Sequence, residues 1–350
     1  MAAITEPTVG VQTFLPQDST GLKRFGELLT RSGILTMTIN IPDSPLTDDV
    51  KRQDYMQALF QGIGSRHQFL NATVREDVQR EDPEHVRLMD GYFGQFRAEY
   101  QKLHPEMPMR ELFPKSKARA EELLVKYFES VSQGIEFVID DGDLQNGDHD
   151  AIKNALREFL LSKQARAACN VSHLRALQEG GREFEAGGIK AVLITEDDIQ
   201  FTDEASRVAD AFDGSLQGLR GQDWDILMLG ASDYVPRERR GTPSAETVSG
   251  CEHIVKVNYS YGNYAYLVNG SSIEKVIGII QNFIEEKKGA GEEVFAQDVV
   301  LSDRMSTDLK VFGCNPKIIG PMTGCYSVIC NQKMDYSMPV TWVVDTGSGT

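Results

Sequence analysis

The chain has 350 residues, enough to bury a large core, and its 41% hydrophobic and 25% charged residues are ordinary for a soluble globular protein. Its formal net charge of −16 argues against broad binding to nucleic acids or anionic membranes, which requires clustered lysines and arginines. There is no run of about 18 apolar residues, no basic and apolar leader, and no CxxC pair among the five cysteines. These features predict a cytoplasmic protein without a membrane span.

The N-terminal part predicts a tail followed by two strands and a helix. Residues 1–30 begin with a polar stretch punctuated by proline and glycine, which is typical of a flexible tail. Residues 34–41 alternate like a β-strand and stop at a proline. A helix is expected over residues 47–60, with Thr47 as its N-cap, and a second strand over residues 69–74.

Residues 77–165 differ in character from the rest of the chain. Residues 85–103 and 117–131 have the pattern of charged amphipathic helices, and a Pro-Glu-Met-Pro break separates them. We interpret this segment as a helical insertion, whose role the sequence does not indicate.

The second half of the chain predicts alternating helices and strands. Residues 189–195 form a short apolar run rich in branched side chains, which favours a buried parallel strand. The whole pattern predicts an α/β domain over residues 31–335, with a mostly parallel sheet flanked by helices, and a C-terminal tail over residues 336–350. The remaining predicted elements are helices over residues 151–168, 172–178, 203–219 and 272–284, and strands over residues 225–230, 253–258 and 263–268.

Three adjacent acids, Glu196, Asp197 and Asp198, follow the apolar run directly. Ligands of open α/β sheets bind just outside the carboxyl ends of the strands. Carboxylates so close together repel one another unless a cation lies among them, and oxygen ligands select hard ions such as Mg²⁺ or Mn²⁺. The sequence therefore predicts a metal site here, and the alternative is an acidic loop that leads into the next helix.

Several motifs in this order resemble glycosyltransferase family 25, the LPS/procollagen-type galactosyl- or glucosyltransferases. The resemblance is loose over residues 34–74 and good over residues 165–330. The matching segments are Ile39-Asn40-Ile41 with Arg52 downstream, Cys169-Asn-Val-Ser172-His173-Leu, Val192-Leu-Ile-Thr-Glu196-Asp-Asp198, Trp224-Asp225-Ile-Leu-Met-Leu-Gly230, Tyr261-Gly-Asn-Tyr-Ala-Tyr266, Gln297-Asp298-Val-Val-Leu301, Pro316 and residues 327–329. Thr195 replaces an apolar residue of the family pattern, Gln297 replaces a proline, and the helical insertion is longer than expected.

The resemblance implies a GT-A-like fold and a metal-dependent transferase that inverts the anomeric carbon of a nucleotide sugar, with a UDP-sugar as the first choice. Asp198, assisted by Glu196, would bind Mn²⁺ or Mg²⁺, which neutralises the leaving diphosphate. Glu196 or Asp197 would otherwise bind sugar or ribose hydroxyls. Inversion needs a base, for which Asp298, between apolar neighbours, is the first candidate and Asp233 the second.

The donor-binding residues are likewise carried over from the matching motifs. Ser172 and His173 would lie at the pyrophosphate or the donor sugar, although a lone histidine is as often a core residue. Asn40 and Arg52 would contact the nucleotide, and Arg52 could equally be a solvated helix charge.

Two other functions compete with the transferase. A metal-dependent nucleotidyltransferase also has acids at strand ends, but it usually has a glycine-rich, basic phosphate loop, which residues 34–45 do not supply. A catalytically inactive carbohydrate-binding or scaffold protein could keep the same fold. The sequence does not identify the acceptor, which could be a glycan, a lipid-linked sugar or a protein.

Overall fold

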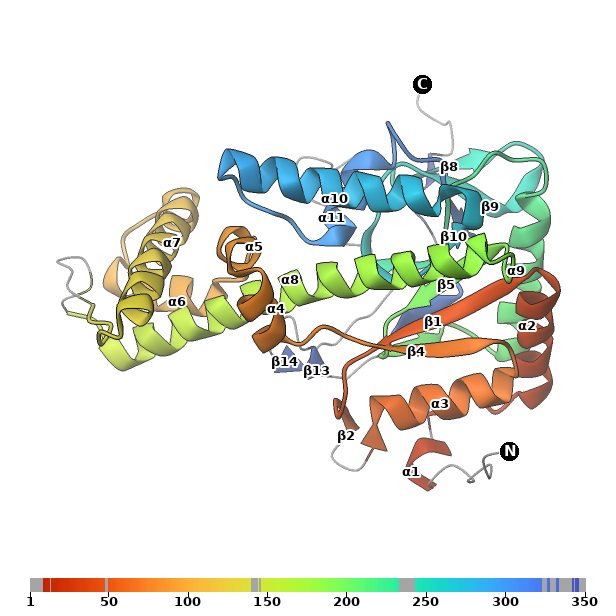
Figure 1. The fold of residues 1–350 in the computed structure, drawn as a ribbon, viewed down its shortest axis with the longest axis horizontal. Coiled ribbons are helices and arrows are strands. Elements are labelled where there is room, and N and C mark those ends of the chain that lie inside the picture. Colours follow the sequence, from red (N-terminus) through yellow and green to blue (C-terminus); the bar gives the residue numbers. More distant parts are fainter. Residues whose placement is uncertain are drawn as a thin grey trace.

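The computed structural model describes the chain except for residues 1–8, 13, 48–49, 140–143, 145, 233–242, 323–325, 328–331, 334–341, 343 and 346–350. Its centre is a nine-stranded sheet, within the described residues, in the order β15-β8-β9-β11-β7-β10-β5-β1-β4 (Figure 1). These strands are β1 (Ile34–Asn40), β4 (His67–Asn71), β5 (Ala191–Thr195), β7 (Ile226–Ser232), β8 (Ala245–Val248), β9 (Cys251–Val257), β10 (Tyr261–Asn269), β11 (Val311–Cys314) and β15 (Val344–Asp345).

The sheet is mixed, so the expectation of a mostly parallel sheet is wrong. Strands β4, β1 and β5 are mutually parallel, as are β11 and β7. Strand β10 lies between β5 and β7 and is antiparallel to both, and β9 is antiparallel to β11. A central strand that is covered on both faces is apolar along its length, whether its neighbours run parallel or antiparallel to it. The sequence pattern therefore does not reveal strand direction.

Helices cover both faces of the sheet (Figure 1). One face packs against α2 (Ser19–Arg31), α3 (Arg52–Ile63) and α9 (Ala205–Gly218), and the other against α8 (His149–Glu185) and α10 (Ile273–Ala290). Leu193 of β5 belongs to the first cluster and Val192 to the second, because successive strand side chains point to opposite faces. The α/β class is confirmed, and the GT-A topology stays a prediction. None of the described helices has the length and hydropathy that a membrane crossing requires.

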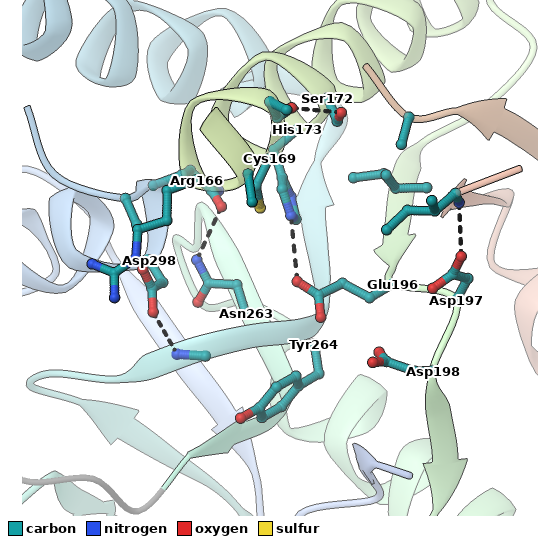
Figure 2. A pocket seen from close by; sticks show the side chains of 18 of the residues that line it. Arg166, Cys169, Ser172, His173, Glu196, Asp197, Asp198, Asn263, Tyr264 and Asp298 are labelled. Carbon is teal, nitrogen blue, oxygen red and sulfur yellow. Dashed lines mark hydrogen bonds and ion pairs between the residues drawn. The ribbon is translucent and has the colours of Figure 1, made fainter. Parts of the chain in front are cut away.

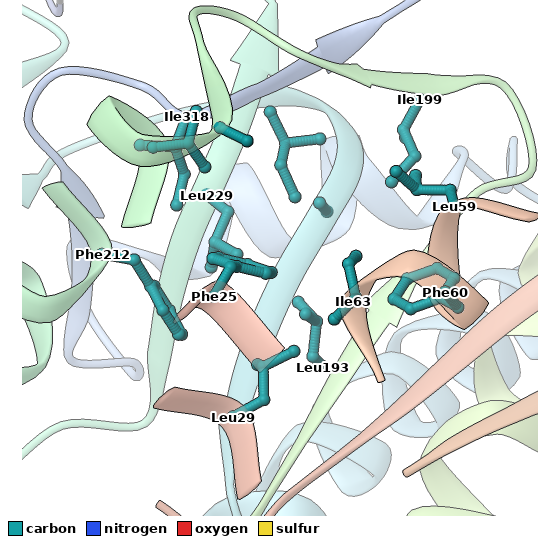
Figure 3. Close-up of a cluster of buried hydrophobic side chains, with 14 of the residues drawn as sticks. Phe25, Leu29, Leu59, Phe60, Ile63, Leu193, Ile199, Phe212, Leu229 and Ile318 are labelled. Carbon is teal, nitrogen blue, oxygen red and sulfur yellow. The ribbon is translucent and has the colours of Figure 1, made fainter. Parts of the chain in front are cut away.

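The predicted tail over residues 1–30 is wrong for its second half, which forms the buried helix α2. Asp18 caps this helix by accepting a hydrogen bond from the Gly21 amide at 2.9 Å. Phe25 and Leu29 are fully buried in the first cluster, where Phe25 packs against Phe212 of α9 (Figure 3). The apolar residues of this segment have helical spacing, which would have predicted α2. The polar stretch before the helix obscured this signal. A short helix, α1 (Val9–Gln12), precedes it.

A glycine sets how closely α2 approaches α3. A Cβ atom added at Gly26 would overlap the carbonyl oxygen of Ile63, so Gly26→Ala is expected to lower the free energy of unfolding by about 1–3 kcal/mol. Gly278 in α10 is the matched control, because a Cβ there meets nothing within 4 Å. Gly278→Ala should stabilise the protein by about 0.5–1 kcal/mol, since alanine is the better helix former. Urea unfolding of both variants measures the contrast, and equal effects would contradict this packing.

The segment before α3 differs from the expected helix over residues 47–60. Strands β2 (Pro45–Thr47) and β3 (Val50–Lys51) pair with each other, and Thr47 pairs with Val50 instead of capping a helix. Helix α3 therefore starts at Arg52, where the backbone amide donates to the Ser44 carbonyl at 3.0 Å. This start places the Arg52 side chain next to the carboxyl end of β5.

The helical character of residues 77–165 is confirmed. Helices α6 (Gly94–Leu103) and α7 (Met109–Gln133) pack with the N-terminal part of α8 around their own hydrophobic cluster, away from the sheet (Figure 1). Helix α8 then continues without a break into the sheet domain, because no glycine or proline interrupts residues 169–171, where two separate helices were expected. The remaining elements are α4 (Arg75–Glu81), α5 (Pro83–Leu88), η2 (Gly270–Ser272), α11 (Gln297–Arg304), β6 (Ile199–Phe201), β12 (Ile319–Pro321), β13 (Tyr326–Ser327) and β14 (Gln332–Lys333).

A partly buried histidine on β4 makes the stability of the fold depend on pH. His67 stacks on Phe60 and its Nε2 lies 3.0 Å from the Thr38 hydroxyl, and burial lowers its pKa to about 4. The unfolded chain takes up this proton near pH 6.5, so unfolding binds protons and the folded state loses stability as the pH falls from 6.5 towards 4. When the pH is lowered from 7 to 4.5, the free energy of unfolding should fall in both proteins. The fall in His67→Gln should be smaller than that in wild type by on the order of 2 kcal/mol. Equal pH slopes in urea unfolding would contradict this assignment.

Candidate functional site

The three acids after β5 lie at a cavity of about 960 Å³ beside the carboxyl end of this strand. Elements from across the chain line it, including α8, the start of β10 and the start of α11. Seven acidic side chains and three arginines, Arg52, Arg75 and Arg166, face this space, so its described lining carries an excess of negative charge. The acids are Glu76, Asp90, Glu196, Asp197, Asp198, Asp298 and Asp303.

Asp197 is held by the protein itself. Its Oδ1 accepts a hydrogen bond from Nη1 of Arg52 at 2.9 Å, and its Oδ2 accepts one from the Ile41 amide at 2.7 Å. The side chains of Asp197 and Arg52 are each 3% exposed. Burial raises the pKa of Asp197 to about 6, against the opposing effect of the arginine. Asp197 thus joins the end of β5 to the end of β1 through the Ile41 amide and to the start of α3 through Arg52. The predicted contacts of Asp197 and Arg52 with the donor stay predictions.

Glu196 and Asp198 are the more accessible acids of the three. Their side chains are 28% and 22% exposed, and the nearest cation to Asp198 is Arg52, whose Nη1 lies 3.2 Å from Oδ2. Burial, together with the charges of Asp198 and Asp298, raises the pKa of Glu196 to about 8. The Asp198 carbonyl accepts from the Met322 amide at 2.6 Å, which secures the loop backbone. These two carboxylates are the groups of the triplet that a cation could reach.

Helix α8 brings Ser172 and His173 to the cavity (Figure 2). The Ser172 hydroxyl donates to the Ala168 carbonyl at 2.7 Å and accepts from the Thr73 amide at 2.9 Å, so it serves the backbone. His173 is 2% exposed, and its Nδ1 lies 2.9 Å from the Tyr266 hydroxyl. Burial lowers the pKa of His173 to about 4, which keeps the ring neutral near pH 7. Its Nε2 faces Glu196 at 3.7 Å.

Asp298 lies in the first turn of α11 and also lines the cavity. Its Oδ2 accepts from the Gly262 amide and its Oδ1 from the Val299 amide, both at 2.9 Å. Each carboxylate oxygen can accept a second hydrogen bond, so these contacts orient Asp298 without exhausting its acceptors. The Asp298 charge reaches Glu196 and His173 across the cavity.

Two predicted residues are not brought to this site by the described structure. Asn40 is 1% exposed, lies at the end of β1 and is not among the residues that line the cavity. Both polar atoms of its side chain are buried without a hydrogen-bond partner in the described part of the chain. Asp233, the second candidate base, lies outside the described residues.

The two departures from the family pattern both take part in polar contacts. The Thr195 hydroxyl lies 2.8 Å from the Thr38 hydroxyl inside the sheet. The Gln297 side-chain amide donates to the Tyr266 hydroxyl at 3.2 Å, and its backbone amide donates to Asn170 Oδ1 at 2.7 Å. Gln297 therefore supplies the polar neighbours of a buried tyrosine, a role that proline could not fill.

The sequence reasoning gave Cys169 and Tyr266 no role at the site. Cys169 precedes His173 by four residues on α8, so the two side chains lie on the same helix face, and both line the cavity. This spacing was the available signal. Tyr266 looked like a core aromatic residue, and only the packing of α8 against β10 brings its hydroxyl to His173.

Comparisons with known proteins identify no family. No protein-family model matches this sequence, and no curated protein matches it. A solved structure described as the crystal structure of A197 from STIV is 12% identical, with a TM-score of 0.22, over 41% of this chain and 62% of that chain. A likeness at this score carries no argument about fold or function. The resemblance to family 25 therefore stays a prediction.

Proposed function

We propose that this protein is a metal-dependent glycosyltransferase that acts in the cytoplasm and transfers a hexose, with inversion, from a nucleotide sugar to a glycan, lipid-linked or protein acceptor. One observation carries the proposal. Glu196, Asp198 and Asp298 share one large cavity with more acids than cations, and burial, together with the charges of Asp198 and Asp298, raises the pKa of Glu196 to about 8. A divalent cation together with a negatively charged ligand would complete such a site.

The acids fit a hard cation. Asp198 and Glu196 offer partly exposed carboxylate oxygens, the ligand type that Mn²⁺ and Mg²⁺ prefer, and Asp197 is occupied by Arg52 and the Ile41 amide. Bound there, the ion would neutralise the charge that develops on the leaving diphosphate of a UDP-sugar. The pair of Arg52 and Asp197 holds the loop after β5 and so keeps Asp198 and Glu196 in place.

Asp298 is the proposed base. In a direct displacement the acceptor hydroxyl loses its proton as its oxygen attacks the anomeric carbon, and a carboxylate oxygen of Asp298 would accept this proton. The backbone amides of Gly262 and Val299 fix the carboxylate and leave acceptor capacity on both oxygens. His173, neutral and oriented by Tyr266, would present Nε2 to a donor hydroxyl near Glu196.

The competing functions gain less support. A nucleotidyltransferase would be expected to bring an excess of basic residues to the triphosphate, whereas the described lining of the cavity has seven acids, three arginines and no lysine. An inactive carbohydrate-binding protein would have no need for a group of partly buried carboxylates that outnumber their cations, which costs stability.

The proposal is tested by a screen of UDP-, GDP- and CMP-sugars, each with Mn²⁺ or with EDTA. We expect one nucleotide class to raise the melting temperature and to be hydrolysed slowly when Mn²⁺ is present. Asp198→Ala should reduce this turnover by about 10²-fold or more, because the leaving group loses its counter-charge. Asp210→Ala is the control, since Asp210 is 61% exposed in a surface ion pair with Arg24. A folded wild type that responds to no donor would rule out the transferase and favour the non-catalytic scaffold.

A further inference from the structure

A second group of potential metal ligands consists of Glu196 and two residues of α8. Glu196 therefore belongs to both groups, and its two carboxylate oxygens allow it to serve one ion with each. Cys169 and His173, one helical turn apart, project towards Glu196 at the end of β5 (Figure 2). The Cys169 Sγ, a ring nitrogen of His173 and a carboxylate oxygen of Glu196 all lie within 4.8 Å of one another. Unlike the acids around Asp198, this group combines sulfur, nitrogen and oxygen.

The distance between the His173 and Glu196 ligand atoms is close to that in a tetrahedral metal site. Zinc binds sulfur at about 2.3 Å and nitrogen or oxygen at about 2.0–2.1 Å, which places pairs of ligand atoms about 3.4–3.6 Å apart. The Nε2 of His173 lies 3.7 Å from Oε1 of Glu196, and the Cys169 sulfur lies within 4.8 Å of its two partners. Cys169 and His173 are both carried by helix α8, so these two ligands need little ordering when a metal ion binds.

The surroundings orient His173 as metal-binding histidines usually are. Its Nδ1 faces the Tyr266 hydroxyl at 2.9 Å, and that hydroxyl also accepts a hydrogen bond from Gln297 at 3.2 Å. In the tautomer whose Nδ1 proton is donated to the Tyr266 hydroxyl, the Nε2 lone pair points towards Glu196. A second partner that holds the other ring nitrogen is a regular feature of histidine ligands.

We propose that Cys169, His173 and Glu196 form a three-ligand site for a borderline-soft divalent ion of the Zn²⁺ type, with its fourth position open to the cavity. Thiolate and imidazole ligands favour Zn²⁺ over Mg²⁺ and Mn²⁺, so this site differs in selectivity from the oxygen site at Asp198. Binding replaces the thiol proton of Cys169, which is released to solvent. The site does not rest on the proposed transferase activity.

The test uses Co²⁺, which replaces Zn²⁺ and reports a thiolate ligand by an intense sulfur-to-cobalt absorption in the near ultraviolet. Metal-free full-length protein is titrated with Co²⁺, and Zn²⁺ is then added to displace it. We expect one equivalent of Co²⁺ to produce the band and Zn²⁺ to abolish it. Cys169→Ser should eliminate the band, whereas Cys251→Ser, which removes another partly exposed thiol, should leave it unchanged.

Two further variants separate this site from its surroundings. Tyr266→Phe removes only the hydroxyl that orients His173, so it should keep the band and weaken Co²⁺ binding by about 10–100-fold. Asp198→Ala should retain the band while it reduces Mn²⁺-dependent donor hydrolysis by about 10²-fold or more, so failure of one proposal leaves the other standing. A wild-type protein without the band, or a band that persists in Cys169→Ser, would overturn the Zn²⁺ site.

Discussion

Arg52→Met is expected to lower the free energy of unfolding at pH 7 by about 3–5 kcal/mol, the usual cost of removing one partner from a buried ion pair. Methionine keeps most of the buried stem of the arginine, so the main loss is its charge. Arg52 donates to Asp197 at 2.9 Å and lies 3.2 Å from Asp198, with a side chain only 3% exposed. Without it, Asp197 retains the Ile41 amide but faces two neighbouring acids in the same cavity.

The pH dependence of this variant identifies the cause. Burial already raises the pKa of Asp197 to about 6, and the loss of the arginine can only raise it further. A carboxyl whose pKa is higher in the folded than in the unfolded state destabilises the fold as the pH rises above the unfolded value. The deficit of Arg52→Met should therefore be larger at pH 8 than at pH 5, and the additional change Asp197→Asn should recover part of it.

Arg31→Ala provides the matched comparison for the buried pair. Arg31 lies 2.5 Å from Asp213, but its side chain is 59% exposed, so its loss should cost only about 0–1 kcal/mol. Urea unfolding at both pH values measures all of these variants. If Arg52→Met cost no more than Arg31→Ala, the Arg52–Asp197 pair would not hold the start of α3 to the end of β5.

Asp298→Asn is expected to reduce the turnover of the responsive donor in the presence of acceptor by about 10²–10⁴-fold, the usual contribution of a general base. Asparagine preserves the shape and one of the two backbone hydrogen bonds, but it cannot accept a proton at neutral pH. The melting temperature should fall only slightly, because the cost is about one hydrogen bond. Stabilisation by donor and Mn²⁺ should be retained, since metal binding depends on Asp198 and Glu196.

Asp308→Asn controls for the loss of a carboxylate nearby in the sequence. Asp308 follows α11, is 44% exposed and pairs with Arg304 on the surface, so its variant should turn over donor like the wild type. If Asp298→Asn retained wild-type turnover, Asp298 would be a helix N-terminal acid without a chemical role. Asp233→Asn would then be the next variant to measure.

Local patterns in the sequence predicted many of the elements but not their arrangement. The apolar run of β5, the helical periodicity of residues 77–165 and the acids after β5 could all be predicted, because each depends on burial within a short segment. The direction of β10 could not, since an apolar strand covered on both faces has the same pattern in either direction. Helix α2 was missed because a polar start concealed the buried face of the segment.

The sequence by itself determined that Glu196, Asp197 and Asp198 directly follow a buried strand. The hydropathy of the strand and the order of the residues can be read from this short segment alone. Only the tertiary structure decided which of the three stays accessible, since Arg52 lies 145 residues before Asp197 and reaches it from the start of another helix. The same holds for Cys169 and His173, which α8 delivers to Glu196 only because it crosses the sheet next to β5. Charge pairing and ligand geometry depend on distances in space, which a linear pattern does not encode.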